Sequence, residues 1–180
     1  MNPTKDRGTT AIFTIGHSNH PLEKFIEMLR AHGIGLIADV RTIPKSRHNP
    51  HYNSEVLAAA LHENRIAYHH LPLLGGLRHP KKDSINSAWE NDSFRGFADY
   101  MQTEGFAAGL SELLAIGREQ RTAVMCAEAL PWRCHRSLIA DALLVREVTV
   151  MHIMSRTSVK EHVLTPWARV QGMAITYPRP

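Results

Sequence analysis

Short apolar runs alternate with amphipathic stretches over most of this chain. A short, mostly apolar run suits a buried strand, and apolar residues three or four positions apart suit one face of a helix. Strands are predicted at residues 11–15, 36–40, 66–71, 122–128 and 148–154. Helices are predicted from Pro21 to before Gly33 and at residues 54–64, 94–102, 106–119 and 134–145. This alternation predicts an α/β fold, a three-layer sandwich with a mostly parallel central sheet flanked by helices.

Two segments lack a clear period. Residues 72–92 contain Gly75, Gly76 and Pro80 and are expected to form a long loop, and loops of more than about 12 to 15 residues are often functional. The tail, residues 157–180, is expected to hold a short helix at 159–164 and an irregular end. Since the 180 residues show no repeat or linker and can bury one full core, we expect one domain over residues 1–180.

The composition excludes several classes of protein. The longest purely apolar run, residues 56–61, is far shorter than the roughly 18 residues of a membrane-spanning helix, so no membrane partner is expected. The first residues lack the layout of a secretory signal, which predicts a cytoplasmic protein. In that reducing compartment the two cysteines, Cys126 and Cys134, are too few for a disulfide scaffold and are either inert or chemical.

The basic charge is concentrated in one segment. The formal net charge is +4, yet residues 41–82 alone carry seven basic and two acidic side chains. Most basic residues of the chain are arginine, which makes planar, two-pronged contacts with phosphate or carboxylate. We therefore expect a small anionic substrate as the partner. Nucleic-acid binding would rest on residues 41–82, because the chain has no helix-turn-helix, zinc-finger or RNA-recognition signature.

Residues able to do chemistry follow the predicted strands at their carboxyl ends. They are His17 and Ser18 after the first strand, Asp39 and Arg41 after the second, His69 and His70 after the third, and Cys126 and Glu128 after the fourth. In an open parallel sheet, ligands bind in the crevice outside these ends. We therefore expect four separate pieces of the sequence to meet at one pocket.

The predicted strand that ends near Cys126 is followed by a short loop and a helix expected to open at or near Cys134. A helix N-terminus presents unpaired amides and a partial positive charge, to which Arg133 and Arg136 add two full charges, so an anion site is expected there. A thiol in such a field has a pKa of roughly 3.5 to 7.5. Cys134 is therefore the predicted nucleophile, and Cys126 is expected to be packed and less acidic. Glu128 is expected to act as a general base or to hold one of these arginines in place.

The same residues permit other functions. Cys126, Cys134, His135 and His17 offer ligands that suit zinc, although adjacent ligands at 134 and 135 are not a familiar spacing. The two cysteines could instead form a reversible disulfide as a redox switch. Neither a cofactor nor a resident metal is predicted.

Several polar and aromatic side chains also have a purely structural explanation. Asp39 and Arg41 could pair only to stabilise their loop, since alternate residues of a strand point to the same face. Surface positions are expected for His32, His62, His79 and His162. Core packing is expected for Trp89, Phe94, Phe97 and Tyr100 because of their near-helical spacing.

Five blocks of sequence together resemble a known family. They are TIGHS at residues 14–18, ADVR at 38–41, LLGGLR at 73–78, FADYM at 97–101 and MCAEALPWRCHRSLIAD at 125–141. They resemble the domain-of-unknown-function 488 family over about residues 12–154. This resemblance implies a compact α/β domain of bacteria and archaea and brings no established reaction. The positions shared with the motifs of that family are His17, Ser18, Asp39, Arg41, Gly75, Gly76, Arg78, Cys126, Glu128, Cys134, His135 and Arg136.

Strand ends and motifs together predict an enzyme, a hydrolase or transferase that acts on a small phosphorylated or nucleotide-like anionic substrate. The predicted catalytic residues are Cys134, Glu128, His17 and Asp39. The predicted ligand-binding residues are Ser18, Arg41, Gly75, Gly76, Arg78, Cys126, Arg133, His135 and Arg136. The alternatives are a non-catalytic module that binds nucleic acid or an anion, and a metal or thiol redox site at Cys126 and Cys134.

Overall fold

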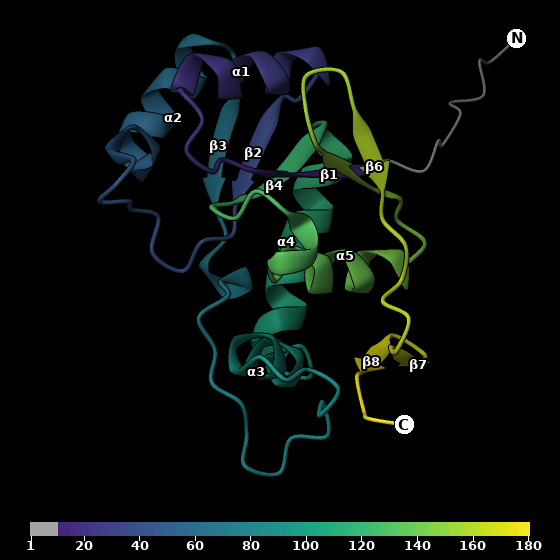
Figure 1. The fold of residues 1–180 in the computed structure, drawn as a ribbon. Coiled ribbons are helices and arrows are strands. Elements are labelled where there is room, and N and C mark those ends of the chain that lie inside the picture. The colour runs from purple at the N-terminus through teal and green to yellow at the C-terminus, as the bar shows by residue number, and fades with distance from the viewer. Residues whose placement is uncertain (1–10) are drawn as a thin grey trace, which may run out of the picture.

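A six-stranded sheet forms the middle layer of the computed structural model, which describes residues 11–180 (Figure 1). The strands are β1 Ile12–Gly16, β2 Leu36–Asp39, β3 Ala67–His70, β4 Thr122–Cys126, β5 Val150–Ile153 and β6 Val159–Glu161. They lie in the order β3-β2-β4-β1-β5-β6, with β1 to β5 parallel to their neighbours and β6 antiparallel to β5. The expected mostly parallel sheet is confirmed.

Helices cover both faces of this sheet. They are α1 Leu22–Ala31, α2 Ser54–Glu63, α3 Asp92–Tyr100, α4 Glu104–Glu119 and α5 Arg136–Leu144. Phe25 of α1 and Leu57 of α2 pack in one hydrophobic core with Phe13 of β1. The helices α3, α4 and α5 pack in a second core, to which Trp89, Phe94, Phe97 and Tyr100 contribute as expected. Figure 1 shows α1 and α2 at the upper left and α3 to α5 below, so the three-layer sandwich is confirmed.

The helices begin where side chains or turns can satisfy their first amides. The carboxamide oxygen of Asn91 accepts from the amides of Ser93 and Phe94, so α3 begins two residues before the predicted start. Thr103 caps α4 in the same way. By contrast, α5 begins at Arg136 rather than at Cys134, because a 3₁₀ turn, η3 Pro131–Arg133, occupies the chain before it.

The tail corrects one prediction outright. The helix expected at residues 159–164 is wrong, because Val159–Glu161 is the strand β6, which pairs with β5. Without β6, β5 would leave a row of unpaired backbone groups at the edge of the sheet. The expected irregular end instead contains a hairpin of β7 Arg169–Gln171 and β8 Ala174–Thr176.

The long loop predicted at residues 72–92 is present and is interrupted by one 3₁₀ turn, η2 Pro72–Leu74. A buried carboxylate on α3, that of Asp99, holds the loop. It accepts hydrogen bonds from the Lys81 amide (2.8 Å), the Ser84 hydroxyl (2.6 Å) and the Asn86 side-chain amide (2.7 Å). Burial opposes the charge on Asp99, yet these bonds lower the pKa of the carboxyl group. The loop is therefore fixed to α3 near its middle.

A chain of hydrogen bonds crosses the interior from Arg136 to Asp141. Arg136 Nη1 donates to Thr14 Oγ1 (3.2 Å), which leaves the Thr14 hydroxyl free to donate to His152 Nδ1 (2.7 Å). His152 Nε2 then donates to His162 Nδ1 (3.0 Å), and His162 Nε2 donates to Asp141 Oδ1 (2.7 Å). Burial lowers the pKa of His152 to about 3, which keeps that ring neutral. The surface position expected for His162 is therefore wrong: the side chain is buried because Asp141 offers it an acceptor inside the protein.

Among residues 11–180, no helix is both long and apolar enough to cross a membrane. The expectation that the chain starts without a secretory signal concerns mainly residues 1–10, which lie outside the described residues.

Candidate functional site

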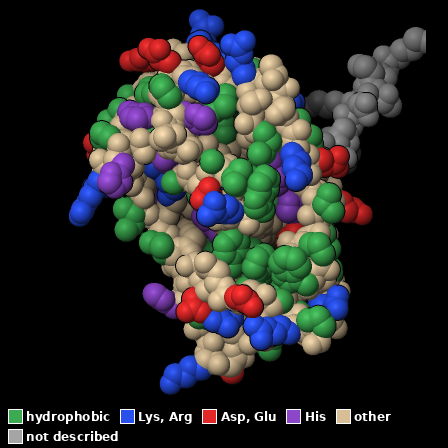
Figure 2. Space-filling view, in the orientation of Figure 1, with side chains coloured by type: hydrophobic (Ala, Val, Ile, Leu, Met, Phe, Trp, Pro, Cys, Tyr) green, Lys and Arg blue, Asp and Glu red, His purple; other side chains and the backbone are tan. Residues whose placement is uncertain are grey.

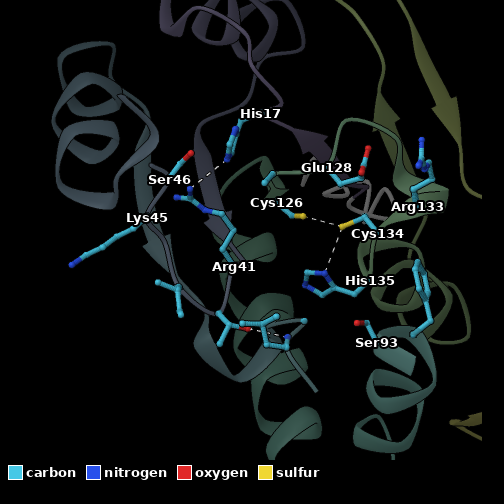
Figure 3. Close-up of a pocket in the computed structure, with 16 residues that line it drawn as sticks. His17, Arg41, Lys45, Ser46, Ser93, Cys126, Glu128, Arg133, Cys134 and His135 are labelled. Carbon is cyan, nitrogen blue, oxygen red and sulfur yellow. Dashed lines mark hydrogen bonds between the residues drawn. The ribbon is translucent and has the colours of Figure 1, made fainter. Parts of the chain in front are cut away.

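A cavity of about 420 Å³ opens at the carboxyl ends of β1, β2 and β4 (Figure 3). His17 follows β1, residues 41–46 lie after β2, and Cys126 is the last residue of β4, with residues 127–128 after it. The remaining walls come from residues 76–77, from the first turn of α3 at residues 93–94, and from residues 133–135 before α5. The cavity thus lies at the edge of the sheet where ligands bind in folds of this type.

The structure brings most of the predicted site residues to this cavity. Those that line it are His17, Arg41, Gly76, Cys126, Glu128, Arg133, Cys134 and His135. Those that do not line it are Ser18, Asp39, Gly75, Arg78 and Arg136. His69 and His70 also lie elsewhere, His69 against Glu112 and His70 against the carbonyl oxygen of Arg41.

Two free thiols face each other at the centre of the site. Cys126 Sγ lies 2.9 Å from Cys134 Sγ, and the amide of Arg136 lies 3.5 Å from the sulfur of Cys134. Burial disfavours a charge on Cys134, but the hydrogen bond from Cys126, the positive charge of Arg136 and that amide outweigh it and lower the pKa of Cys134 to about 6. The hydrogen bond to Cys134 and burial raise the pKa of Cys126 to about 12. Cys134 is therefore the thiolate and Cys126 its hydrogen-bond donor.

His135 stands beside the thiolate in a fixed tautomer. Its Nε2 lies 3.1 Å from the carbonyl oxygens of both Val40 and Leu74. Because carbonyl oxygens only accept hydrogen bonds, Nε2 carries a hydrogen in either protonation state. In the neutral ring the lone pair is then on Nδ1, which lies 3.5 Å from Cys134 Sγ. The geometry allows His135 to take the proton of the Cys134 thiol.

Gly76 is required by the imidazole of His135. A Cβ atom at position 76 would lie 2.6 Å from His135 Nδ1 and 2.8 Å from Cγ of the same ring. Real Cβ atoms do not approach a ring this closely, so any side chain at 76 would displace the imidazole. The close approach at Gly76 is thus to the neighbour of the thiolate, whereas a Cβ at Gly75 would meet Thr42.

The substitution Gly76→Ala is expected to destabilise the protein by about 1–3 kcal/mol, the usual cost of overpacking. Urea unfolding measures this change. Gly35→Ala is the matched control, because its new Cβ would meet nothing closer than 3.7 Å. Adding His135→Ala to Gly76→Ala should recover part of the lost stability, because it removes the ring that clashes. Strictly additive effects of the two substitutions would contradict the contact.

The carboxylate of Asp39 accepts all of its hydrogen bonds from groups inside the protein. Its carboxylate accepts from Arg41 Nε (2.9 Å), Arg41 Nη2 (2.7 Å), the Arg41 amide (3.1 Å) and the hydroxyl of Tyr68 (2.6 Å), and the residue is fully buried. Burial disfavours the charge of Arg41, but the contact with Asp39 outweighs it and raises the pKa of the guanidinium. Asp39 thus orients Arg41 rather than facing a substrate, and Arg41 itself lines the cavity.

His17 is a neutral ring at the opposite wall. Its Nδ1 lies 2.7 Å from the carbonyl oxygen of Ser18, and its Nε2 accepts from Arg41 Nη1 at 3.4 Å (Figure 3). The ring stacks on Tyr52 with 4.0 Å between centroids. Burial lowers the pKa of His17 to about 4. At neutral pH this side chain supplies no charge, and both of its ring nitrogens are engaged within the protein.

Arg136 lies behind the cavity and not in it. The guanidinium is buried and donates to the carbonyl oxygens of Glu128 and Ala129 and to Thr14 Oγ1. Gly16 lets the same loop approach, since a Cβ there would lie 1.9 Å from the carbonyl oxygen of Glu128. The direct ligand contact expected of Arg136 is replaced by a structural and electrostatic role.

Glu128 does not pair with a nearby arginine. Its carboxylate accepts from the amide of Leu130 at 3.2 Å, and no ion pair with Arg133 or Arg136 forms in the described chain. The half-buried side chain of Glu128 lines the cavity (Figure 3). Glu128 holds Arg136 through its carbonyl oxygen and not through its carboxylate, and its role as a general base stays a prediction.

Several lining residues escaped the sequence analysis. They are Thr42, Ile43, Lys45, Ser46, Leu77, Ser93, Phe94 and Ala127. Lys45 and Arg133 are exposed, so two long basic side chains lie at the mouth of the cavity, whereas Cys126 and Cys134 at its floor are buried. The local excess of basic residues at 41–82 contained the signal for Lys45, whereas nothing in the pattern of α3 distinguished Ser93.

The comparisons with known proteins give one match. A family model described as Domain of unknown function DUF488 matches residues 21–143, about two thirds of the chain. No curated protein and no solved structure gives a significant match.

Proposed function

The chain belongs to the family Domain of unknown function DUF488, a description that names no reaction, and from the cavity we propose that it is an enzyme with Cys134 as nucleophile. The substrate class is a small phosphorylated or nucleotide-like anion, and the reaction is a hydrolysis or a group transfer. The observation that carries this proposal is the set of groups around Cys134 Sγ: the Cys126 thiol at 2.9 Å, the Arg136 amide at 3.5 Å and His135 Nδ1 at 3.5 Å.

The three groups around Cys134 have two roles in forming its thiolate, proton acceptor and hydrogen-bond donor. His135 Nδ1 takes the proton of the Cys134 thiol, while the Cys126 thiol and the Arg136 amide donate to the resulting sulfur anion. A nucleophilic cysteine activated by a neighbouring base and a cation is a recurring solution in enzymes. The thiolate needs reduced cysteines, and a reducing cytoplasm supplies that condition, so we place the activity there.

The basic side chains at the mouth favour an anionic substrate. Arg41 lines the cavity with its guanidinium held by Asp39, and Lys45 and Arg133 carry exposed charges at the rim. Arg41 is fixed in one orientation, which suits recognition of a planar or tetrahedral anion. Lys45 and Arg133 attract such a ligand from solution.

The chemical step follows from these positions. Cys134 Sγ forms a bond to the electrophilic phosphorus or carbon of the substrate, and the bond from that atom to the leaving group breaks. The leaving group takes the proton that His135 received from the thiol. Attack by water on the adduct completes a hydrolysis, and attack by another acceptor completes a transfer. Glu128, at the same wall, is placed to take the proton of that second nucleophile.

The pH dependence of alkylation tests the thiolate. With a pKa of about 6, Cys134 should react with iodoacetamide at a rate that rises with pH through about 6 and is level above about pH 7. An ordinary thiol would show its midpoint near about 8.5. Mass spectrometry of the modified peptide separates Cys134 from Cys126, and Cys134→Ser gives the background rate. A midpoint near that of an ordinary thiol would remove the nucleophile from the proposal.

A panel of nucleotides and sugar phosphates tests the substrate class. Turnover of one member, blocked by prior alkylation of Cys134, is the expected result. Neutral analogues that lack the phosphate should not react. A turnover that survives alkylation would contradict the role of Cys134.

A metal site is the second candidate function, because the ligand atoms of Cys126, Cys134 and His135 lie within 4.8 Å of one another. Two thiolates and a histidine nitrogen suit zinc and would leave its fourth position to the cavity. Elemental analysis of protein purified without added metal distinguishes the candidates: about one zinc per chain favours the metal site, and a content near zero favours the free thiolate.

Nucleic-acid binding by residues 41–82 stays a prediction.

A further inference from the structure

A second cavity, of about 320 Å³, lies on the other side of the turn η3. Trp132 of η3 lines this cavity, whereas its neighbour Arg133 lines the first one. The other walls include Trp89 from the loop before α3 and Trp167 from the segment after β6. All three tryptophans of the chain therefore lie around one hollow.

These tryptophans are unusually available to a ligand. Trp132 is 52% exposed and Trp167 is 40% exposed, although indole rings gain much free energy from burial. Trp89 and Trp167 meet edge to face with 5.2 Å between ring centroids, so this corner of the wall is already ordered. Figure 2 shows hydrophobic side chains gathered over the middle of this face, with basic and histidine side chains beside them. Exposed aromatic patches with a polar rim are typical of binding sites.

The polar groups of the cavity narrow the class of ligand. The indole N–H of Trp89 has no hydrogen-bond partner in the described chain, but it is buried and therefore closed to a ligand. The ring nitrogens of His152 and His162 are all engaged in internal hydrogen bonds. The ammonium group of Lys160 lies 4.9 Å from the centroid of the Trp132 ring and provides a positive charge there, and the neighbouring Glu161 also lines the cavity.

We propose that this second cavity binds a nucleotide, with the base stacked among the tryptophans and the phosphate at Lys160. A nucleobase has a flat face that can stack on the exposed rings of Trp132 and Trp167. The phosphate complements the only charge that contacts a tryptophan ring in the described chain, that of Lys160. The volume is within the range of about 300–1,000 Å³ typical for small ligands. This binding does not depend on a reaction at Cys134.

Intrinsic fluorescence gives a direct test, because every tryptophan of the chain lines this cavity. Titration with AMP is expected to change the tryptophan emission in a saturable way. Adenosine should bind more weakly, since it lacks the phosphate, and ribose 5-phosphate should leave the emission unchanged, since it lacks the base. A flat emission during the AMP titration, with no heat of binding in calorimetry, would overturn the proposal.

Variants locate the site. Trp132→Ala is expected to weaken AMP binding by about 5- to 100-fold, the usual range for the loss of one stacking ring, and Trp132→Phe should restore most of it. Lys160→Gln should weaken AMP binding and leave adenosine binding unchanged. Met173→Ala, which removes another exposed apolar side chain (60% exposed) away from the cavity, is the matched control and should bind like the wild type. Calorimetry is used where the substitution removes the fluorophore.

The two proposals fail separately. If Cys134→Ser or alkylation of Cys134 weakens AMP binding as strongly as Trp132→Ala does, the base lies in the first cavity and the second site is overturned. If AMP binds at the tryptophans while Cys134 shows ordinary thiol reactivity, the result contradicts the proposed reaction and supports the nucleotide site. Wild-type AMP affinity in Trp132→Ala would overturn the site regardless of the state of Cys134.

Discussion

Serine in place of Cys134 is expected to lower kcat/KM by at least about 10³-fold on the substrate that the panel identifies. A serine hydroxyl does not ionise near neutral pH, so neither His135 nor the surrounding donors can convert it into an anion of comparable reactivity. The side chain is buried and the replacement is nearly isosteric, so the fold should persist. Steady-state kinetics, with circular dichroism as a check of folding, measure the effect.

Cys126→Ser is the matched control for this result, because it changes the other sulfur of the same pair. Its hydroxyl can still donate to the Cys134 thiolate, so activity should fall much less, by about tenfold. Two outcomes would contradict the mechanism. If Cys134→Ser keeps its activity, the sulfur is not the nucleophile. If Cys126→Ser and Cys134→Ser are equally inactive and both lose bound zinc, the pair serves as metal ligands.

Asp39→Ala is expected to lower the free energy of unfolding by about 3–5 kcal/mol, the largest effect on stability that we expect from one side chain here. The substitution leaves the guanidinium of Arg41 buried without its carboxylate, and it also removes the acceptor of the Tyr68 hydroxyl. Urea unfolding monitored by circular dichroism measures the change.

Asp92→Ala provides the comparison for Asp39→Ala, because Asp92 also pairs with an arginine, Arg95, but is 74% exposed. Exposed pairs contribute at most about 1 kcal/mol, so the two losses should differ several-fold. Replacing both Asp39 and Arg41 by apolar residues should cost less than Asp39→Ala alone, because no buried charge is then left unpaired. Equal losses for Asp39→Ala and Asp92→Ala would show that Arg41 is solvated when Asp39 is absent.

The sequence predicted what depends on local pattern. The apolar run before Asp39 and the one before Cys126 are strands because both faces of the sheet are covered, so burial leaves a continuous apolar signature. The parallel arrangement then placed His17, Arg41 and Cys126 at the same edge of the sheet. These inferences use chain order and the fixed direction of parallel strands.

Features that depend on distant contacts could not be predicted in this way. The strand β6 has three exposed residues and therefore no apolar pattern, so only the free edge of β5 explains it. The basic residue Arg136 is buried because Thr14, remote in sequence, and the carbonyl oxygens of the preceding loop accept its hydrogen bonds. From its position alone Asp39 could be catalytic or structural, and the hydrogen bond from the distant Tyr68 hydroxyl favours the structural role.

The hydrogen-bonded chain from Arg136 to Asp141 is polarised in one direction from its cationic to its anionic end. Its links, Thr14, His152 and His162, are hydrogen-bonded head to tail, so each polarises the next. The guanidinium that lowers the pKa of Cys134 is thereby linked to the carboxylate of Asp141, further along α5. Reactivity of the sulfur should consequently respond to substitutions in the C-terminal quarter of the chain, such as at His162, that never approach the first cavity.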